Sequence, residues 1–311
     1  MLRFYFWTGA DASQEHIVEI PPKSGTASIG QRLQAAGVVR NAGVFRYFAL
    51  LTGQARRLKA GEYAFPAHAT LPQVVRQLAE GQIVHHTFLV PEGYSARQIA
   101  EKLETEGLAK AADFLAVAND PDNARAWGLP AQALEGFLFP DTYELIKGMN
   151  ASAIAQEMVK RFKAKAGSAL LPGAPLKPLQ LVTLASIIER EVKAPQERPR
   201  VAAVFYNRMA KHMRLESCAT VLYGLGRAGG ALSLDDLQHP SLYNTYRHAG
   251  LPPGPISNPG ISSLQAAAHS DQTEDLFFVV AGDGTHIFSK DFESHKKAKW
   301  AHKKARQAFQ P

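Results

Sequence analysis

The sequence is poor in cysteine and has no long apolar run. Its single cysteine, Cys218, excludes an internal disulfide framework and a zinc site built from thiolates. No stretch approaches the roughly 20 apolar residues that a membrane-spanning helix needs, and the opening MLRFYFW is too short for the apolar region of a signal peptide. We therefore expect the chain as given to be soluble, or to have lost an anchor.

Charge of either sign is moderate, and its excess lies at one end. The 35 basic residues outnumber 28 acidic ones, and the C-terminal stretch KDFESHKKAKWAHKKARQ supplies seven of the basic residues. This pattern is typical of a solvated helix or of one drawn to a polyanion. Because the basic residues cluster in a tail and lack interleaved aromatic residues of the kind that recognise bases, we expect no nucleic-acid partner. A length of 311 residues with 46% hydrophobic residues indicates about two folded domains.

Three segments of the first hundred residues share one spacing. Each begins with an apolar residue and a proline, places a Thr or Ser where it can cap a helix, and ends the helix at a glycine. The capping candidates are Thr26, Thr70 and Ser95, and the glycines are Gly37, Gly81 and Gly107. Between them lie i, i+4 apolar pairs that should face a core, namely Ile29 and Leu33, Val74 and Leu78, and Ile99 and Leu103. Strands are predicted at HIVEI, GEYAF and VHHTFLV, which gives a small α+β module.

The rest of the chain predicts a mixed α/β domain with core helices and a C-terminal β-hairpin, so the fold class is α+β overall. Two helices are clear after Pro178, and LFFVVA and THIF flank the turn GDG as a hairpin. Between the two helices and the hairpin lies the long Tyr- and Pro-rich run YNTYRHAGLPPGPISNPG, which is typical of an ordered binding loop. The predicted parts are an N-terminal segment that could be the remnant of a trimmed anchor (1–14), the repeat module (15–107), a connecting helical region (108–177) and a catalytic domain with the basic tail (178–311).

Two glutamates stand at the edge of the first of these helices, in LASIIEREV. On a helical wheel Glu189 and Glu191 fall about 80° to either side of the apolar stripe, so periodicity does not distinguish them. Partial burial beside Ile187 and Ile188 would suit a general acid. The alternative is that both glutamates are surface residues that pair with Arg190, Lys193 or Arg198.

Several motifs, in this order, resemble the endolytic murein transglycosylase (YceG-like) family. They are LKAGEYAF, VPEGYS, EGFLFPDTY, LASIIEREV, VAAVFYNRM, TVLYGLG, YNTYRHAGLPPGPISNPG and FFVVAGDGTHIFSKDFESH, which together cover nearly the whole chain. The resemblance implies that Glu189 is the catalytic acid and that Glu191 lies beyond it. It also implies a lyase in which the muramic acid's own C6 hydroxyl attacks and a 1,6-anhydro end results, with no metal and no organic cofactor. The local charges support this assignment, because Arg190 and Lys193 should favour the ionised form of Glu191.

The remaining predicted site residues would bind the glycan. They are Tyr243, Asn244, Thr245 and Tyr246 of the long loop, Thr220 and Tyr223 in TVLYG, and His286 at the hairpin, where a structural role for the histidine is the alternative. One departure from the family stands beside TVLYG. The family usually has an acidic residue and a proline there, whereas this chain has Cys218 and Ala219, with Glu216 nearby.

The resemblance further implies nascent glycan strands of peptidoglycan as the substrate and peptidoglycan synthases as candidate partners. It implies a LysM-like role in glycan positioning for the N-terminal repeats. Family members are single-pass proteins of the bacterial inner membrane with the enzyme facing the periplasm, and we expect the same location here, with the anchor absent or trimmed. Two alternatives stay open: a muramidase that hydrolyses the same bond, and a glycan-binding protein without activity.

Overall fold

The computed structural model describes residues 15–167, 175–281 and 284–308. The chain divides into two compact units. Unit 1 holds the described residues through Phe88, with Gly107–Ala109 and Tyr143–Met149; unit 2 holds Leu89–Glu106, Lys110–Thr142 and the described residues from Asn150 onward. The predicted N-terminal segment, residues 1–14, lies outside the described residues.

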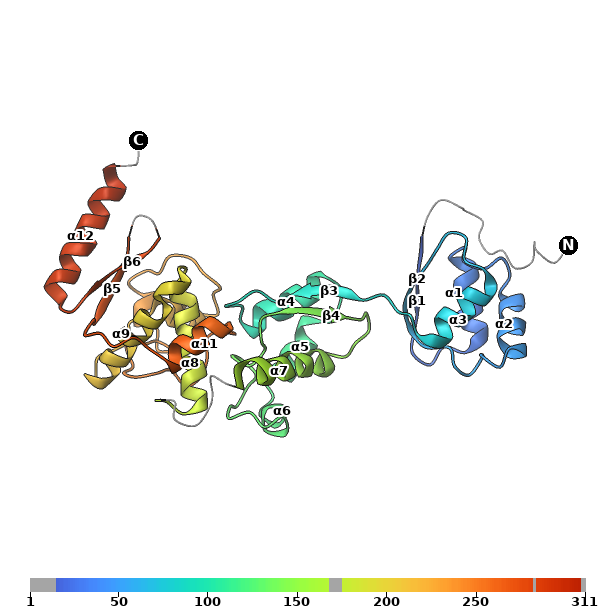
Figure 1. Cartoon of the computed structure of the whole chain (residues 1–311), viewed down its shortest axis with the longest axis horizontal. Helices are drawn as coiled ribbons and strands as arrows, with labels where there is room; N and C mark the ends of the chain where they lie inside the picture. The colour runs from blue at the N-terminus through green and yellow to red at the C-terminus, as the bar shows by residue number, and fades with distance from the viewer. Residues whose placement is uncertain (1–14, 168–174, 282–283, 309–311) are drawn as a thin grey trace. The chain divides into compact units, whose positions relative to one another are not determined.

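Unit 1 is built on a pair of antiparallel strands with helices gathered beside them (Figure 1). Strand β1 pairs with β2 so that His16 faces Phe65 and Ile20 faces Gly61. Its elements are β1 (His16–Ile20), α1 (Thr26–Ala35), α2 (Ala42–Leu51), β2 (Gly61–Phe65) and α3 (Leu71–Glu80). The largest buried side chains of its core are Phe45, Tyr63 and Phe65.

The repeated spacing correctly predicted which side chains are buried. All six residues of the i, i+4 pairs in α1, α3 and α4 (Ala96–Thr105) are at most 2% exposed. Capping boxes begin α3 and α4, where the side chains of Gln73 and Gln98 accept the backbone N–H groups of Thr70 and Ser95. The prediction for Thr26 was wrong, because Gly25 is the N-cap of α1 and the Thr26 hydroxyl instead donates to the carbonyl of Ala55.

The division of the chain differs from the boundary expected at residue 107. The third repeat contributes β3 (His86–Leu89) and α4, and α4 belongs to unit 2 rather than to unit 1. Strand β3 pairs with β4 (Thr142–Leu145), a strand that the sequence analysis did not single out. The shared pattern therefore predicts that each helix buries one face, but it does not predict against which core that face packs.

Unit 2 is mainly helical, and near its C-terminal end a two-stranded sheet precedes the last helix. Helix α8 packs against α9 and α11, and the antiparallel β5–β6 hairpin packs against the C-terminal helix α12 (Figure 1). The predicted strand pair is confirmed, with Val280 facing His286, while Gly282 and Asp283 of the predicted GDG turn lie outside the described residues. The further elements of the unit are α5 (Ala111–Ala118), α6 (Pro121–Ala126), α7 (Ala151–Ala166), α8 (Pro178–Glu191), η3 (Pro195–Glu197), α9 (Arg198–Ala210), α10 (Cys218–Gly224), η4 (Asp236–Gln238), α11 (Ile261–Ala268), β5 (Phe277–Val280), β6 (His286–Ser289) and α12 (Phe292–Ala308).

The fold class is therefore mixed α+β, with small two-stranded sheets and many helices. None of the helices in the described parts of the chain has the length and apolar character required to cross a bilayer.

Candidate active site

Helix α8 carries both glutamates out of the core of unit 2. Every residue from Leu181 to Ile188 is buried, and Glu189 and Glu191 follow at its C-terminal end as partly exposed residues. The long loop expected after the helices is ordered against this helix. The Ser186 hydroxyl accepts the N–H of Ile256 at 3.0 Å, and the Ser257 hydroxyl donates to the carbonyl of Ser186 at 3.1 Å. The loop therefore runs beside the end of α8 that bears the acids.

The Glu189 carboxylate is held on both oxygens. Oε1 accepts Arg198 Nη2 at 2.9 Å, and Oε2 accepts the backbone N–H of Gly260 at 2.9 Å. Its side chain is 5% exposed, and that of Arg198 is 8% exposed. Two charge-assisted hydrogen bonds in such a sheltered position fix the direction of the carboxylate. This is the preorganisation that a proton-transferring group requires.

A second carboxylate, Glu92, reaches the same guanidinium. Its Oε2 lies 3.7 Å from Arg198 Nη2, and its side chain is 49% exposed. Burial raises the pKa of Glu92, the negative charge of Glu189 raises it further, and Arg198 lowers it. The sequence analysis did not select Glu92 or Arg198 as site residues, although VPEGYS was among the quoted motifs.

Two glycines lie where these segments meet. A Cβ on Gly260 would lie 1.8 Å from Glu92 Oε1, so any larger residue would displace the second carboxylate. Gly93 has a φ of 78°, and a Cβ there would lie 3.5 Å from Glu189 Cγ. Asn258 joins the two segments, because its carbonyl accepts the N–H of Gly93 at 2.9 Å and its own N–H donates to the carbonyl of Tyr94 at 2.8 Å.

Glu135, from the motif EGFLFPDTY, is a third acid of this region. Its carboxylate accepts the N–H of Ala96 at 3.0 Å, Asn258 Nδ2 at 3.0 Å and the Tyr223 hydroxyl at 3.3 Å. Burial outweighs these donors and raises its pKa to about 7. The motif was read as a join between domains, and Glu135 was not selected, because nothing in a sequence pattern reveals donors that lie 39 to 123 positions away.

Glu191 has different partners. Its carboxylate accepts the Ser217 hydroxyl and the N–H of Ala219, so it satisfies donors at the start of α10. Burial raises the pKa of Glu191, while the hydrogen bonds from Ser217 and Ala219 and then the charges of His286 and Arg190 lower it by smaller amounts. Arg190 thus acts in the direction expected from the sequence, but burial is the larger influence on the pKa of Glu191.

The loop residues Tyr243 to Tyr246 lie beside α10. Asn244 and Thr245 are at most 1% exposed, and so is Thr220. Thr245 Oγ1 accepts the N–H of Ser217 at 3.0 Å and lies 2.8 Å from Thr220 Oγ1, so these residues fasten the loop to the helix. Direct contact of Asn244, Thr245 and Thr220 with substrate stays a prediction.

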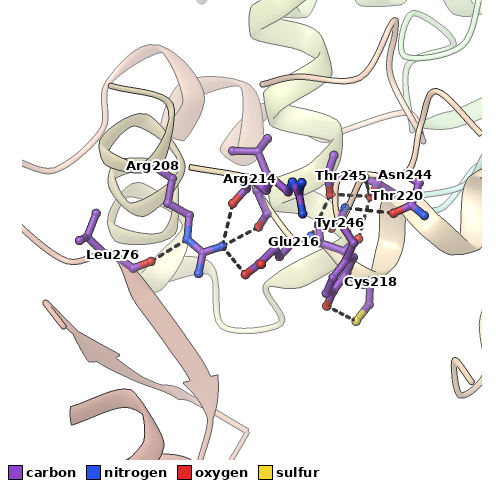
Figure 2. A network of polar contacts seen from close by, with 11 residues as sticks. Arg208, Arg214, Glu216, Cys218, Thr220, Asn244, Thr245, Tyr246 and Leu276 are labelled. Atoms are coloured by element: carbon purple, nitrogen blue, oxygen red, sulfur yellow. Dashed lines mark hydrogen bonds and ion pairs between the residues drawn. The ribbon is translucent and has the colours of Figure 1, made fainter. Parts of the chain in front are cut away.

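Figure 2 shows what surrounds the departure from the family at Cys218. The exposed Cys218 Sγ lies 3.2 Å from the hydroxyl of Tyr246. Glu216 is paired with Arg208 Nη1 at 3.3 Å, and the same guanidinium donates to the carbonyl of Leu276 (Figure 2). The carboxylate of Glu216 therefore forms an ion pair with Arg208 in this structure.

Tyr223 and Tyr243 are the predicted aromatic residues that face open space. Their ring centroids are 4.8 Å apart, and both line a pocket of about 780 Å³. Glu135 and Arg190 line the same pocket, and Arg190 directly follows Glu189 in the chain. Glu189 itself is not among the lining residues. That the loop from Tyr243 to Tyr246 contacts the same substrate as Glu189 therefore stays a prediction.

His286 is buried on the hairpin and is held by one acid. Its Nδ1 lies 2.7 Å from Glu197 Oε2, and its backbone N–H donates to Glu197 Oε1 at 2.9 Å. These bonds tie β6 to the turn before α9, which fits the structural alternative for this histidine. Within residues 15–167, 175–281 and 284–308, no cluster of three or more His, Cys, Asp or Glu side chains is arranged to hold a metal ion.

Helix α8 thus carries a sheltered carboxylate that an arginine and a backbone amide hold in place, and the next residue, Arg190, lines a pocket with two tyrosines. This arrangement is typical of a protein that binds or acts on a polar ligand. The YceG-like family model matches residues 18–301, and the chain belongs to this family.

Relatives in the same family cover most of the chain. A Bacillus subtilis (strain 168) protein named endolytic murein transglycosylase is 31% identical over 311 residues, which is 91% of this chain and 83% of that protein. A Streptococcus pneumoniae (strain D39) protein of the same name is 29% identical over 93% of this chain, and the match spans 58% of that longer protein. A crystal structure of a YceG-like protein from Listeria monocytogenes is similar with a TM-score of 0.62 and 35% identity, covering 91% of this chain and 99% of that one.

Proposed function

We propose that this chain is an endolytic murein transglycosylase, a lyase that cuts the glycan strands of peptidoglycan. The observation that carries the proposal is Glu189: it lies in the motif that the family resemblance marks as catalytic, and both of its oxygens are held in place. The relatives that bear this activity in their names match nine-tenths of the chain or more.

One acid suffices for this reaction if the substrate supplies its own nucleophile. Protonated Glu189 gives its proton to the glycosidic oxygen as the C1–O bond breaks, and the sugar's C6 hydroxyl then attacks C1 and returns its proton to Glu189. The product is a 1,6-anhydro end, and the acid is regenerated. Arg198 and the N–H of Gly260 hold the carboxylate that exists between the two transfers. The tethered hydroxyl has the advantage of proximity over water.

Three finer assignments belong to the same proposal. The β1–α1–α2–β2 body of unit 1 is compact and has its own core, which supports a LysM-like module that positions glycan. The enzyme acts on nascent strands and ends their elongation next to peptidoglycan synthases. It works in the periplasm at the inner membrane. The last two rest on the family resemblance alone.

The deciding experiment is product analysis. Purified protein is incubated with sacculi or nascent glycan, and the fragments are identified by mass spectrometry. We expect anhydro-muramyl ends and internal cleavage, and at least about a hundredfold less product from Glu189→Gln. Glycan that is retained without any new ends would instead support a binding protein without activity.

The pairing of Glu92 with the same arginine favours a second candidate, a muramidase. Glycosidases that hydrolyse with retention or inversion need two carboxylates, and Glu92 and Glu189 share Arg198. Such an enzyme would leave reducing ends. Reducing ends that disappear in Glu92→Gln would establish the hydrolase.

A further inference from the structure

The pocket beside α10 holds more positive than negative side chains. It has a volume of about 780 Å³ and is formed by α4, α5, α8, α10 and the loop residues Ser241, Tyr243 and Ile256. Three arginines line it, Arg97, Arg190 and Arg227, against the two acids Glu101 and Glu135. A volume of this size takes a ligand of several residues or sugar rings.

Two of the three arginines are already occupied by the protein. Arg190 donates to the carbonyls of Gly93 and Ala228, and Arg227 pairs with Asp236 at 3.2 Å. Both guanidinium groups therefore help to hold the walls of the pocket.

Arg97 is different, since within the described parts of the chain its guanidinium has neither a hydrogen bond nor an ion pair. It is an exposed residue whose side chain approaches Gly226 across the pocket rim. It also stands in the first turn of α4, where the helix dipole does not favour a cation. The Arg97 guanidinium is therefore available to a ligand with a negative group.

The other walls suit a peptide attached to a sugar. Tyr223 and Tyr243 offer aromatic faces, while Leu115 and Ile256 are apolar. The Asn119 side chain can both donate and accept hydrogen bonds, as peptide groups require. The Tyr223 hydroxyl donates to Glu135, which fixes the orientation of that ring.

We propose that this pocket is a subsite for the peptide stem of peptidoglycan and that Arg97 binds a carboxylate of that stem. The inference rests on the proposed function, because it names the part of the same substrate that this pocket takes. Arg190 connects the pocket with the proposed catalytic acid, because it lines the pocket and directly follows Glu189 in α8. The stem of the muramic acid next to the cut bond would occupy the pocket and orient the strand, so the enzyme would prefer stem-bearing over denuded glycan.

The first test measures binding, which does not depend on turnover. Three soluble probes are titrated by calorimetry: a disaccharide bearing its peptide stem, the same compound with its stem carboxylates amidated, and the disaccharide freed of its stem. The last compound still carries the lactyl carboxylate, so it separates the two sources of negative charge. We expect wild type to bind the stem-bearing probe about tenfold more tightly than either of the others, the effect of one charge-assisted hydrogen bond at a partly exposed site.

Arg97→Gln should remove this preference, and Arg97→Lys should keep part of it. Arg125→Gln is the matched control, because Arg125 is another exposed arginine of unit 2 that pairs with Asp122 and does not line the pocket. Melting curves accompany each variant, and since Arg97 is exposed we expect no loss of melting temperature.

A second test separates this inference from the proposed function. Cleavage of stem-bearing and of amidase-treated glycan is followed in parallel, and Arg97→Gln should raise KM about tenfold on the stem-bearing glycan alone, with kcat unchanged. Loss of cleavage by wild type on both glycans would remove the proposed function, while the binding series would still decide the subsite. The subsite is refuted if wild type binds the three probes equally, if Arg97→Gln retains the preference, or if it weakens the stem-free probe as much as the stem-bearing one.

Discussion

Two regions at the end of α8 surround acids that are two residues apart and equally placed on the helical wheel. Around Glu189, separate segments bring together an arginine, a second carboxylate and a backbone amide. Around Glu191, a hydroxyl and an amide at the start of α10 close over the carboxylate. The first arrangement leaves Glu92 half exposed beside the acid, and the second places Glu191 among groups that hold the fold together. The comparison teaches that the partners of an acid, rather than its position on the helix, distinguish Glu189, which we propose as the proton donor, from Glu191.

The largest expected effect tests this comparison directly. Glu189→Gln keeps the size of the side chain but cannot shuttle a proton, so release of anhydro-ended fragments at neutral pH should fall by roughly 10² to 10⁴. Glu191→Gln, its matched control on the same helix, should cost much less activity. If Glu191→Gln is the inactive variant, or if both variants stay near wild type, the proposed mechanism is wrong.

Next in size is the pH dependence due to Glu135. Its pKa is raised from 4.5 to about 7, so between these values the folded state holds a proton that the unfolded state has released. Stability should therefore fall as pH rises from 4.5 to 7, by about 2 to 3 kcal/mol after allowing for partial exposure. Denaturant unfolding of wild type and Glu135→Gln at several pH values measures this, and the variant should lack that part of the slope. Parallel profiles for the two proteins would contradict the assignment.

Glu191→Ala should act on stability rather than on chemistry. It leaves the Ser217 hydroxyl and the N–H of Ala219 without their acceptor, which should lower the free energy of unfolding by about 1 to 3 kcal/mol. Urea denaturation gives the value, and Ser217→Ala serves as a control that removes one donor instead of the acceptor. A variant that is as stable as wild type but inactive would reverse the roles assigned to the two acids.

The smallest effect is expected at Glu92. If the enzyme is a lyase, Glu92→Gln should change turnover by less than about tenfold, because the C6 hydroxyl and Glu189 complete the reaction without a second carboxylate. The measurement is the rate and the chemistry of new glycan ends. A loss as large as that of Glu189→Gln, together with reducing ends in wild type, would point to hydrolysis.

Local features of this protein could be predicted from its sequence because they depend on residues close in the chain. The i, i+4 pairs such as Val74 and Leu78 are buried as expected, Thr70 and Ser95 begin helices, and the two strands predicted on either side of GDG are paired. The apolar run from Leu181 to Ile188 is a buried helix with both acids at its edge. Each of these is set by periodicity, capping and turn chemistry within a few residues.

The assembly of the site depended on the tertiary structure. Gly260 lies 71 positions from Glu189, and Asn258 lies 123 positions from Glu135, so no local pattern could predict these contacts. The same applies to the third repeat, whose helix α4 has the pattern of α1 and α3 but belongs to unit 2. Sequence by itself determined which faces must be buried and which motif carries an acid. Only the folded chain decided which partners each carboxylate meets, because hydrogen bonds, charges and burial act through space and not along the chain.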